Sequence, residues 1–309
     1  MAIADKCREF NAWVESLKAA NQFFYLRQVD PPASPVVTMD GRPLVMLGSN
    51  NYLGLATHPR VVEATISAVR EYGTGACSSR VLTGTTSLHN RLESRLAEFK
   101  GTEAAIVFST GFMTMMGTIS AMAGEGDVVL SDELNHASIV EGCRLTDADV
   151  RIYRHSDMSS LESELNAAPP GANKLVVTDG VFSMKGTVCD LPAIRKLADT
   201  YGAQVMVDDA HGTGAIGKTG RGTLEYFGME GSVEFVCGTF SKSLGTIGGF
   251  TASTRDVVSF LKLRARPFIF SASPPPSSMA TVLACLDVIE EEPELLEKLR
   301  RNTEFLREG

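Results

Sequence analysis

Short apolar runs alternate with amphipathic helical segments from about residue 102 onward, and this alternation limits the possible folds more than any other feature of the sequence. In DLPAIRKLADTYG, for example, Leu191, Ile194 and Leu197 fall on one face of a helix. Apolar strands that alternate with helices predict a parallel sheet covered by helices on both faces. We therefore predict an α/β fold built on a mostly parallel seven-stranded sheet. Its strands are expected at residues 103–109, 127–131, 149–153, 174–178, 204–208, 233–238 and 248–252.

Composition and charge argue against several classes of protein. The 309 residues are 44% hydrophobic and 21% charged, as in an ordinary soluble globular protein, and the formal net charge is −8. Nucleic acids and anionic membranes require a basic surface, so neither is the expected main partner. No apolar run approaches the roughly 18 residues of a membrane span, and residues 1–10 lack the pattern of a secretory signal. Six separated cysteines without a C-x-x-C pair predict reduced thiols, no metal site and a cytoplasmic location.

The chain is expected to contain one large domain with additions at both ends. Residues 1–44 combine a helical pattern with the Pro-rich turn DPPASP, which suggests an arm rather than a domain. Residues 45–275 hold the alternating strands and helices. Residues 276–309 read as two further helices, and apolar side chains near the end, such as Phe305 and Leu306, have no evident partner. We therefore expect a segment that continues beyond them.

A glycine pattern at Gly212, Gly214 and Gly217 raises the alternative of a dinucleotide site. The pattern G-x-G-x-x-G after a strand binds a pyrophosphate when the glycines open a helix. Here KTGRGT follows, with more glycine and no helical pattern, and two aspartates precede the glycines, where they would repel a pyrophosphate. We therefore do not expect an NAD-binding protein.

Lys242, Asp208 and His211 each follow a predicted strand, and they form the candidate reactive centre. Taken singly, Asp208 could cap a turn and His211 could be an ordinary polar residue at a strand end. The carboxyl ends of parallel strands meet at one edge of the sheet, however, so the three side chains are expected together. A lysine among glycines and serines can lose its proton and act as a nucleophile. Together the three residues suit pyridoxal 5′-phosphate (PLP), whose phosphate would bind at a helix start such as STGFMTMMG.

Seven motifs follow one another between about residue 45 and the end of the chain. They are SNNYLGLATHP, SSRVLTGT, FSTGFM, LNHASI, VTDGVFSMKG, VDDAHGTGAIGKTGRG and GTFSKSLGTIGGF. Together they resemble the α-oxoamine synthase family, fold-type I PLP enzymes that join an amino acid to an acyl-CoA and release CoA and CO2. The resemblance implies PLP as the cofactor, acyltransferase activity and a homodimer with a shared active site. It also implies that residues 45–275 form the large PLP-binding domain.

The resemblance assigns catalytic and ring-binding roles to five residues. Lys242 matches the lysine that forms the Schiff base with PLP and later removes the substrate α-proton. Asp208 matches the partner of the pyridine nitrogen, and His211, helped by Ser183, matches the residue that bonds the phenolic oxygen. His136 matches the histidine that stacks on the ring and guides the substrate carboxylate, although from the residues alone it reads as a helix cap.

Further residues are assigned to the phosphate and to the substrate. Gly111 and Phe112 would offer backbone N–H groups to the phosphate, and Thr239 would offer its hydroxyl. The remaining assignments are substrate contacts by Asn50 and Ser79, and contacts to the neighbouring subunit's phosphate by Ser271 and Ser273.

The motifs fit more than one branch of the family. GTFSKSLGTIGGF, SSRVLTGT and RPFIFSASPPP look most like the serine palmitoyltransferase branch. Ser79 stands where glycine-specific members carry threonine, which favours a larger amino acid. VTDGVFSMKG and VDDAHGTGAIG fit the 8-amino-7-oxononanoate synthase and glycine C-acetyltransferase branches equally well. The prediction is therefore a serine palmitoyltransferase-like condensation, with the other two branches as alternatives. Family members continue into a small domain whose arginine binds the substrate carboxylate, and residues 276–309 would begin that domain.

A non-catalytic partner subunit is an alternative of a different class. Such subunits usually lack the lysine, whereas this chain combines Lys242 with Asp208, His211 and His136. We therefore expect an active enzyme whose partners are an amino acid and an acyl-CoA.

Overall fold

The computed structural model describes residues 2–31 and 33–308, and it divides into two compact units, Met1–Gly48 and Ser49–Gly309. Asp40 and Gly41 in the first unit have positive φ angles of 52° and 73°, which suit the tight two-residue turn between antiparallel strands. The elements of this unit are α1 (Ile3–Ala19), β1 (Val29–Asp30), β2 (Val36–Met39) and β3 (Arg42–Val45), with the three strands in one antiparallel sheet.

The second unit is built on a seven-stranded sheet in the order β4-β10-β9-β8-β7-β5-β6. All seven predicted strands are confirmed, with small shifts at their ends. The strands are β4 (Ala104–Phe108), β5 (Val128–Asp132), β6 (Asp149–Tyr153), β7 (Lys174–Asp179), β8 (Ala203–Asp208), β9 (Phe235–Thr239) and β10 (Gly249–Ser253).

One strand of this sheet runs against the others. β10 pairs antiparallel with both β4 and β9, whereas the remaining neighbours pair in parallel. Gly249, which begins β10, therefore lies beside Phe108 at the end of β4 and beside Thr239 at the end of β9. The mostly parallel sheet predicted from the sequence is confirmed, and the antiparallel strand brings the ends of β4 and β9 close to each other.

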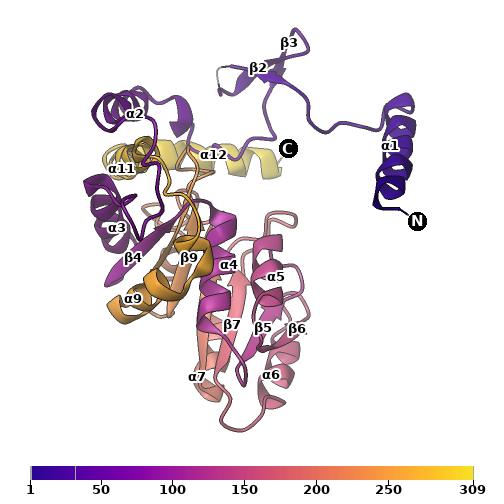
Figure 1. Cartoon of the computed structure of the whole chain (residues 1–309), viewed down its shortest axis with the longest axis vertical. Helices are drawn as coiled ribbons and strands as arrows, with labels where there is room; N and C mark the ends of the chain where they lie inside the picture. The colour runs from indigo at the N-terminus through magenta and orange to yellow at the C-terminus, as the bar shows by residue number, and fades with distance from the viewer. Residues whose placement is uncertain (1, 32, 309) are drawn as a thin grey trace. The chain divides into compact units, whose positions relative to one another are not determined.

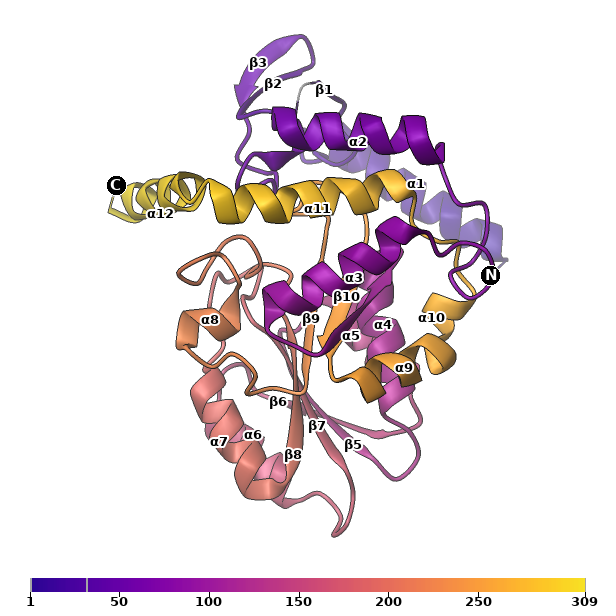
Figure 2. The same ribbon diagram turned by 90° about the vertical axis from the view of Figure 1, so that its left-hand side faces the viewer.

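Helices cover both faces of the sheet because consecutive strand residues point to opposite sides. Val176 packs with the cluster that includes α3, α6 and α7, and Val177 packs with the cluster of α4 and α5. Figure 2 shows α7 and α4 on opposite sides of the strands. The helices of these layers are α3 (Ser87–Lys100), α4 (Gly111–Met122), α5 (Ala137–Arg144), α6 (Met158–Asn166), α7 (Leu191–Tyr201), α9 (Arg255–Arg264) and α10 (Arg266–Ile269).

The remaining helices include α11 (Pro276–Glu291), which packs against α2 (Pro59–Tyr72) and α3 (Figure 1). Proline at the first position of α11 ends the stiff segment of three prolines, as expected from its missing N–H. The others are η1 (Leu55–Thr57), α8 (Thr223–Phe227) and α12 (Glu294–Glu308). Among the described residues no helix is both long and apolar enough to cross a bilayer. The domain boundary expected at residue 275 stays a prediction.

Candidate active site

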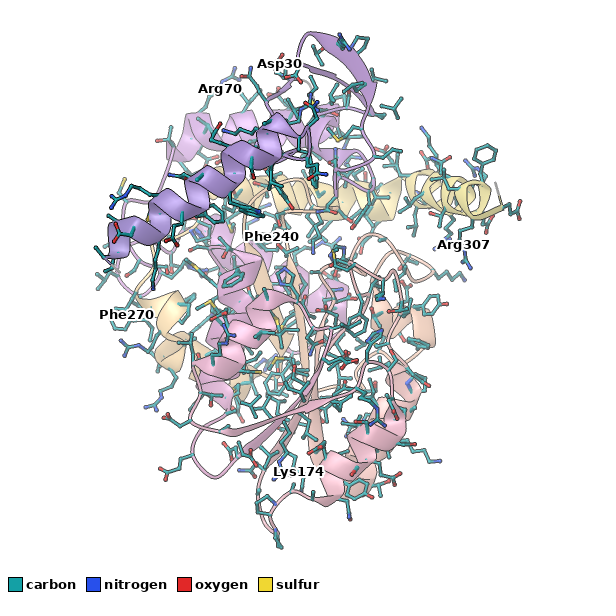
Figure 3. All side chains as sticks on the ribbon, turned by 90° about the vertical axis from the view of Figure 1, so that its right-hand side faces the viewer. Asp30, Arg70, Lys174, Phe240, Phe270 and Arg307 are labelled. Carbon is teal, nitrogen blue, oxygen red and sulfur yellow. The ribbon has the colours of Figure 1, made fainter. Side chains whose placement is uncertain are left out.

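A cavity of about 320 Å³ lies at the carboxyl ends of β4, β7, β8 and β9. In Figure 3, Phe240, which directly follows β9, marks this end of the sheet. Lys174, at the start of β7, marks the opposite end. The cavity gathers eight of the residues selected from the sequence. They are Gly111, Phe112, His136, Ser183, Asp208, His211, Thr239 and Lys242.

Lys242 is the lysine of this cavity, and it lies in the turn between β9 and β10. Burial lowers its pKa, whereas the negative charges of Asp208 and Asp179 act in the opposite direction. No hydrogen bond or ion pair within residues 2–31 and 33–308 uses its Nζ atom. The amine is therefore available for a covalent bond to a ligand and for proton transfer.

Asp208 and Asp179 are paired residues at the ends of the adjacent strands β8 and β7. Both carboxyl groups are buried, and burial raises the pKa of each of them. The charge of Asp208 raises the pKa of Asp179 further, whereas Lys242 acts in the opposite direction on both. A cationic group that entered the cavity would allow these carboxyls to ionise, so the site favours a protonated ring nitrogen.

His211 and Asn50 are joined through Tyr52. The Tyr52 hydroxyl lies 2.7 Å from Nδ1 of His211, and it donates to Oδ1 of Asn50 at 3.2 Å. Burial lowers the pKa of His211 to about 4, and the positive charges of Lys242 and His136 contribute to this shift. His211 is therefore neutral at pH 7, and it can hydrogen-bond a ligand oxygen without carrying a charge.

The start of α4 lies at the cavity. Thr110 caps this helix by accepting a hydrogen bond from the Met113 N–H at 3.1 Å. Gly111 and Phe112 occupy the first turn, where backbone N–H groups have no partner inside the helix. A Cβ atom on Gly111 would lie 2.6 Å from Oγ1 of Thr239, so only glycine allows this close approach of α4 to β9. The geometry suits a phosphate.

His136 combines a structural position with a place at the cavity. It is the N-cap of α5, and its Nδ1 atom accepts a hydrogen bond from the Ser138 N–H at 3.2 Å. Its own N–H donates to Oδ2 of Asp179 at 3.1 Å. Burial lowers the pKa of His136, and the charge of Lys242 adds to the effect. The helix-cap interpretation from the residues alone is therefore confirmed, and His136 also lines the cavity. Its stacking on the cofactor stays a prediction.

Four other sequence-selected residues lie outside the cavity lining. Asn50 reaches His211 only through Tyr52. Ser79 pairs with Ala272 in an isolated antiparallel bridge. The Ser273 hydroxyl donates to the Gly84 carbonyl at 2.7 Å, and the Ser271 hydroxyl lies 3.6 Å from the sulfur of Met113. The proposed substrate and neighbour-phosphate roles of these residues stay predictions.

A buried ion pair accounts for Gly212, one glycine of the pattern after β8. Lys100 of α3 donates to Asp209 at 2.8 Å and to the Thr213 hydroxyl at 2.7 Å. Asp209 also accepts hydrogen bonds from the backbone and side chain of Thr223. A Cβ atom at Gly212 or Gly222 would overlap the Asp209 carboxylate. Gly212 and Gly222 therefore pack around a buried carboxylate, whereas a Cβ atom at Gly214 or Gly217 would meet Ser243 or Glu225. No helix follows the pattern before α8.

Sequence reasoning missed Tyr52, Asp179, Asp209 and Lys100. Asp179 stands in the quoted motif VTDGVFSMKG at the end of a predicted strand, so its position was a usable signal. Lys100 gave no such signal, because a lysine at the end of a predicted helix ordinarily faces solvent.

Among the described residues no group of three or more His, Cys, Asp or Glu side chains could hold a metal ion.

Comparisons with known proteins agree with this geometry. The family described as aminotransferase class I and II matches residues 42–309. An 8-amino-7-oxononanoate synthase of Bacillus velezensis is 46% identical over 304 residues, which are 98% of this chain and 75% of the relative. A serine palmitoyltransferase of Sphingobacterium spiritivorum is 44% identical over 306 residues, which are 99% of this chain and 76% of the relative.

Solved structures show the same relationship. A lysine-to-alanine variant of serine palmitoyltransferase from S. paucimobilis, with bound PLP–myriocin, has a TM-score of 0.94 and 37% identity. The match covers 98% of this chain and 76% of that one. These similarities confirm the family and the fold-type I architecture predicted from the sequence. The chain therefore belongs to the aminotransferase class I and II family, and within it to the α-oxoamine synthases, which are PLP-dependent acyltransferases.

Proposed function

We propose that this chain catalyses the decarboxylative condensation of an L-amino acid with an acyl-CoA, releasing CoA and CO2 and forming an α-amino ketone. The observation that carries the proposal is the single cavity that gathers Lys242, Asp208, His211 and the start of α4. A nucleophilic amine, a buried carboxylate and an anion site at a helix start are the groups that PLP requires.

The residues of the cavity fit PLP, and each would perform a distinct task. The N–H groups of Gly111 and Phe112 and the Thr239 hydroxyl would hold the phosphate. Asp208 would pair as a carboxylate with the protonated pyridine nitrogen, because the positive charge of the ring would offset the burial that raises the pKa of Asp208 in the protein alone. His211 and Ser183 would bond the phenolic oxygen. Bound PLP supplies an electron sink for the negative charge that develops at the substrate Cα.

Lys242 and His136 would move and guide the substrate atoms. Lys242 Nζ would hold the cofactor, leave when the amino acid arrives, and then take the α-proton. Such a positioned base contributes roughly 10²–10⁴-fold to the rate. His136 would cover one face of the cavity and keep the substrate carboxylate in line with the reacting carbon. The lowered pKa of Lys242 supports the role of a base, because the neutral amine is the form that accepts a proton.

The branch within the family is the finer part of the proposal. The sequence motifs favour serine palmitoyltransferase, whereas the 46% identical relative is an 8-amino-7-oxononanoate synthase. That product has nine carbons with the amino group on the eighth, so it requires alanine and a seven-carbon dicarboxylic acyl group. We keep serine with a long-chain acyl-CoA as the proposed pair, and alanine with pimeloyl-CoA and glycine with acetyl-CoA as the alternatives.

A substrate survey tests the proposal. The PLP-loaded protein would be incubated with each of the three pairs, and release of the free CoA thiol would be measured with a thiol reagent. We expect CoA release that requires both substrates of one pair. Loss of release when either substrate is omitted separates condensation from thioester hydrolysis. A protein that binds PLP but releases no CoA with any pair would contradict the proposed reaction.

Gly111→Ala is expected to weaken PLP binding by about 10- to 100-fold. The new Cβ would lie 2.6 Å from Oγ1 of Thr239, so the start of α4 must move away from the phosphate site. Overpacking of this kind costs about 1–3 kcal/mol. Fluorescence titration with PLP measures the affinity. Gly124→Ala is the control, because a Cβ there meets nothing within 4 Å, and its affinity should equal that of the wild type. Equal affinities in all three proteins would contradict the phosphate assignment.

The homodimer expected from the resemblance gives a second prediction. If Ser271 and Ser273 reach the neighbouring subunit's phosphate, the double alanine variant should bind PLP more weakly by about 1–3 kcal/mol. Dilution below the dimer dissociation constant should also release PLP. The single Ser271→Ala variant separates this role from local structure, because Ser273 also bonds the Gly84 carbonyl of its own chain. A monomer in light scattering that binds PLP stoichiometrically would contradict the shared site.

The cytoplasmic location expected from the cysteines also stays a prediction.

A further inference from the structure

Tyr52 links Asn50, which the resemblance assigns to the substrate, to His211, which the resemblance assigns to the cofactor. It lies just before η1 and lines a second cavity of about 700 Å³. Two residues, His211 and Ser183, line both this cavity and the candidate active site. Tyr52 therefore contacts His211 from the side of the second cavity, and it does not line the cavity proposed to hold PLP.

The hydrogen bonds of Tyr52 form a short chain. Its hydroxyl lies 2.7 Å from Nδ1 of His211 and donates to Oδ1 of Asn50 at 3.2 Å. A phenolic hydroxyl has one proton to donate and lone pairs to accept with. Oδ1 of Asn50 can only accept, so both contacts are satisfied together only when Tyr52 donates to Asn50 and accepts from Nδ1 of His211. This arrangement leaves Nε2 as the free ring nitrogen. The chain thus determines both the angle of the imidazole and its tautomer.

Burial and nearby charges keep Tyr52 and His211 in one protonation state near pH 7. Burial raises the pKa of Tyr52, so the phenol keeps its proton. Burial, Lys242 and His136 lower the pKa of His211, so the imidazole stays neutral. Neither partner then gains from a proton transfer. The bond between them is a fixed neutral hydrogen bond rather than an ion pair.

We infer that Tyr52 is a positioning residue that fixes the ring orientation and tautomer of His211 and couples them to Asn50. The inference deepens the proposed function, on which it rests for the role of His211.

The test uses the Tyr52→Phe variant of the full chain, which removes only the hydroxyl. Ring nitrogen signals of isotope-labelled histidine report the tautomer, and the loss of one signal in His211→Asn identifies His211 among the five histidines. In the wild type without PLP we expect the Nδ1–H tautomer of His211. In Tyr52→Phe and in Asn50→Ala we expect this preference to be lost. Identical His211 signals in the wild type and Tyr52→Phe would overturn the inference.

The same variant is measured with PLP and substrates. We expect the PLP dissociation constant to rise by about 3- to 10-fold, the usual effect of one lost hydrogen bond. The value of kcat should fall while KM for the acyl-CoA is unchanged, because only His211 is displaced. A change in KM alone would instead assign Tyr52 to substrate binding and contradict the positioning role.

Tyr201→Phe is the matched control. The Tyr201 hydroxyl donates to Glu162 at 3.2 Å, and Tyr201 lines neither of the two cavities. Its removal should leave the His211 signals and PLP affinity at wild-type values. The histidine signals are read in the protein without PLP or substrate, so they judge Tyr52 independently. If the wild type turns over no substrate pair, the proposed function fails while this readout still stands.

Discussion

Lys242→Ala is expected to abolish turnover, with a loss of more than about 10⁴-fold, while leaving the fold intact. Lys242 is the lysine that lines the candidate site, and its Nζ atom serves no hydrogen bond or ion pair of the described residues. Its removal therefore costs little stability. It does remove both the group that holds PLP covalently and the base that takes the α-proton.

Borohydride reduction and mass spectrometry measure this outcome. In the wild type, reduction should fix PLP on the peptide that carries Lys242, and the visible absorbance of the bound cofactor should disappear. The variant should show neither the absorbance nor a labelled peptide. Lys185→Ala is a control, since Lys185 is exposed in the turn between Val181 and Val188. A reducible attachment that persists in Lys242→Ala, or appears on another lysine, would refute the central assignment.

Asp208→Asn is expected to have opposite effects on catalysis and on the stability of the PLP-free protein. The neutral amide cannot hold the pyridine nitrogen protonated, so PLP affinity should fall and exchange of the substrate α-proton should slow by orders of magnitude. Burial raises the pKa of Asp208 from 3.8 to about 6 in the protein alone. A carboxyl shifted in this direction destabilises the folded state once it ionises, by up to about 3 kcal/mol.

The pH dependence follows from the sign of this shift. Below the unfolded-state pKa the carboxyl is protonated in both states and costs nothing. As the pH rises from about 4 through about 6, the PLP-free wild type should lose stability that Asp208→Asn retains. Denaturant unfolding at several pH values measures the difference, and deuterium exchange measures the α-proton. Asp190→Asn is the control, because asparagine also caps a helix and Asp190 caps α7. Near-normal exchange in Asp208→Asn would show that another group pairs with the nitrogen.

The seven strands and most cavity residues could be predicted from the sequence because their signals are local. An apolar run such as residues 174–178 has the composition of a doubly buried strand wherever it lies in the sheet. Parallel strands also share one carboxyl edge, which is why Asp208, His211 and Lys242 could be expected together from their positions after apolar runs. The role of His136 depended on the resemblance, because its local signal is that of a helix cap.

The tertiary structure decided the contacts that depend on strand order, since no local pattern encodes which strands become neighbours. Antiparallel β10 between β4 and β9 brings Gly111 against Thr239. The pairing of β7 with β8 sets Asp179 beside Asp208, where burial and the charge of Asp208 raise the pKa of Asp179. Tyr52 and His211 are 159 positions apart, and only the folded chain joins them. The sequence by itself thus determined the elements and the reactive groups, whereas long-range packing determined the charges and hydrogen bonds that tune them.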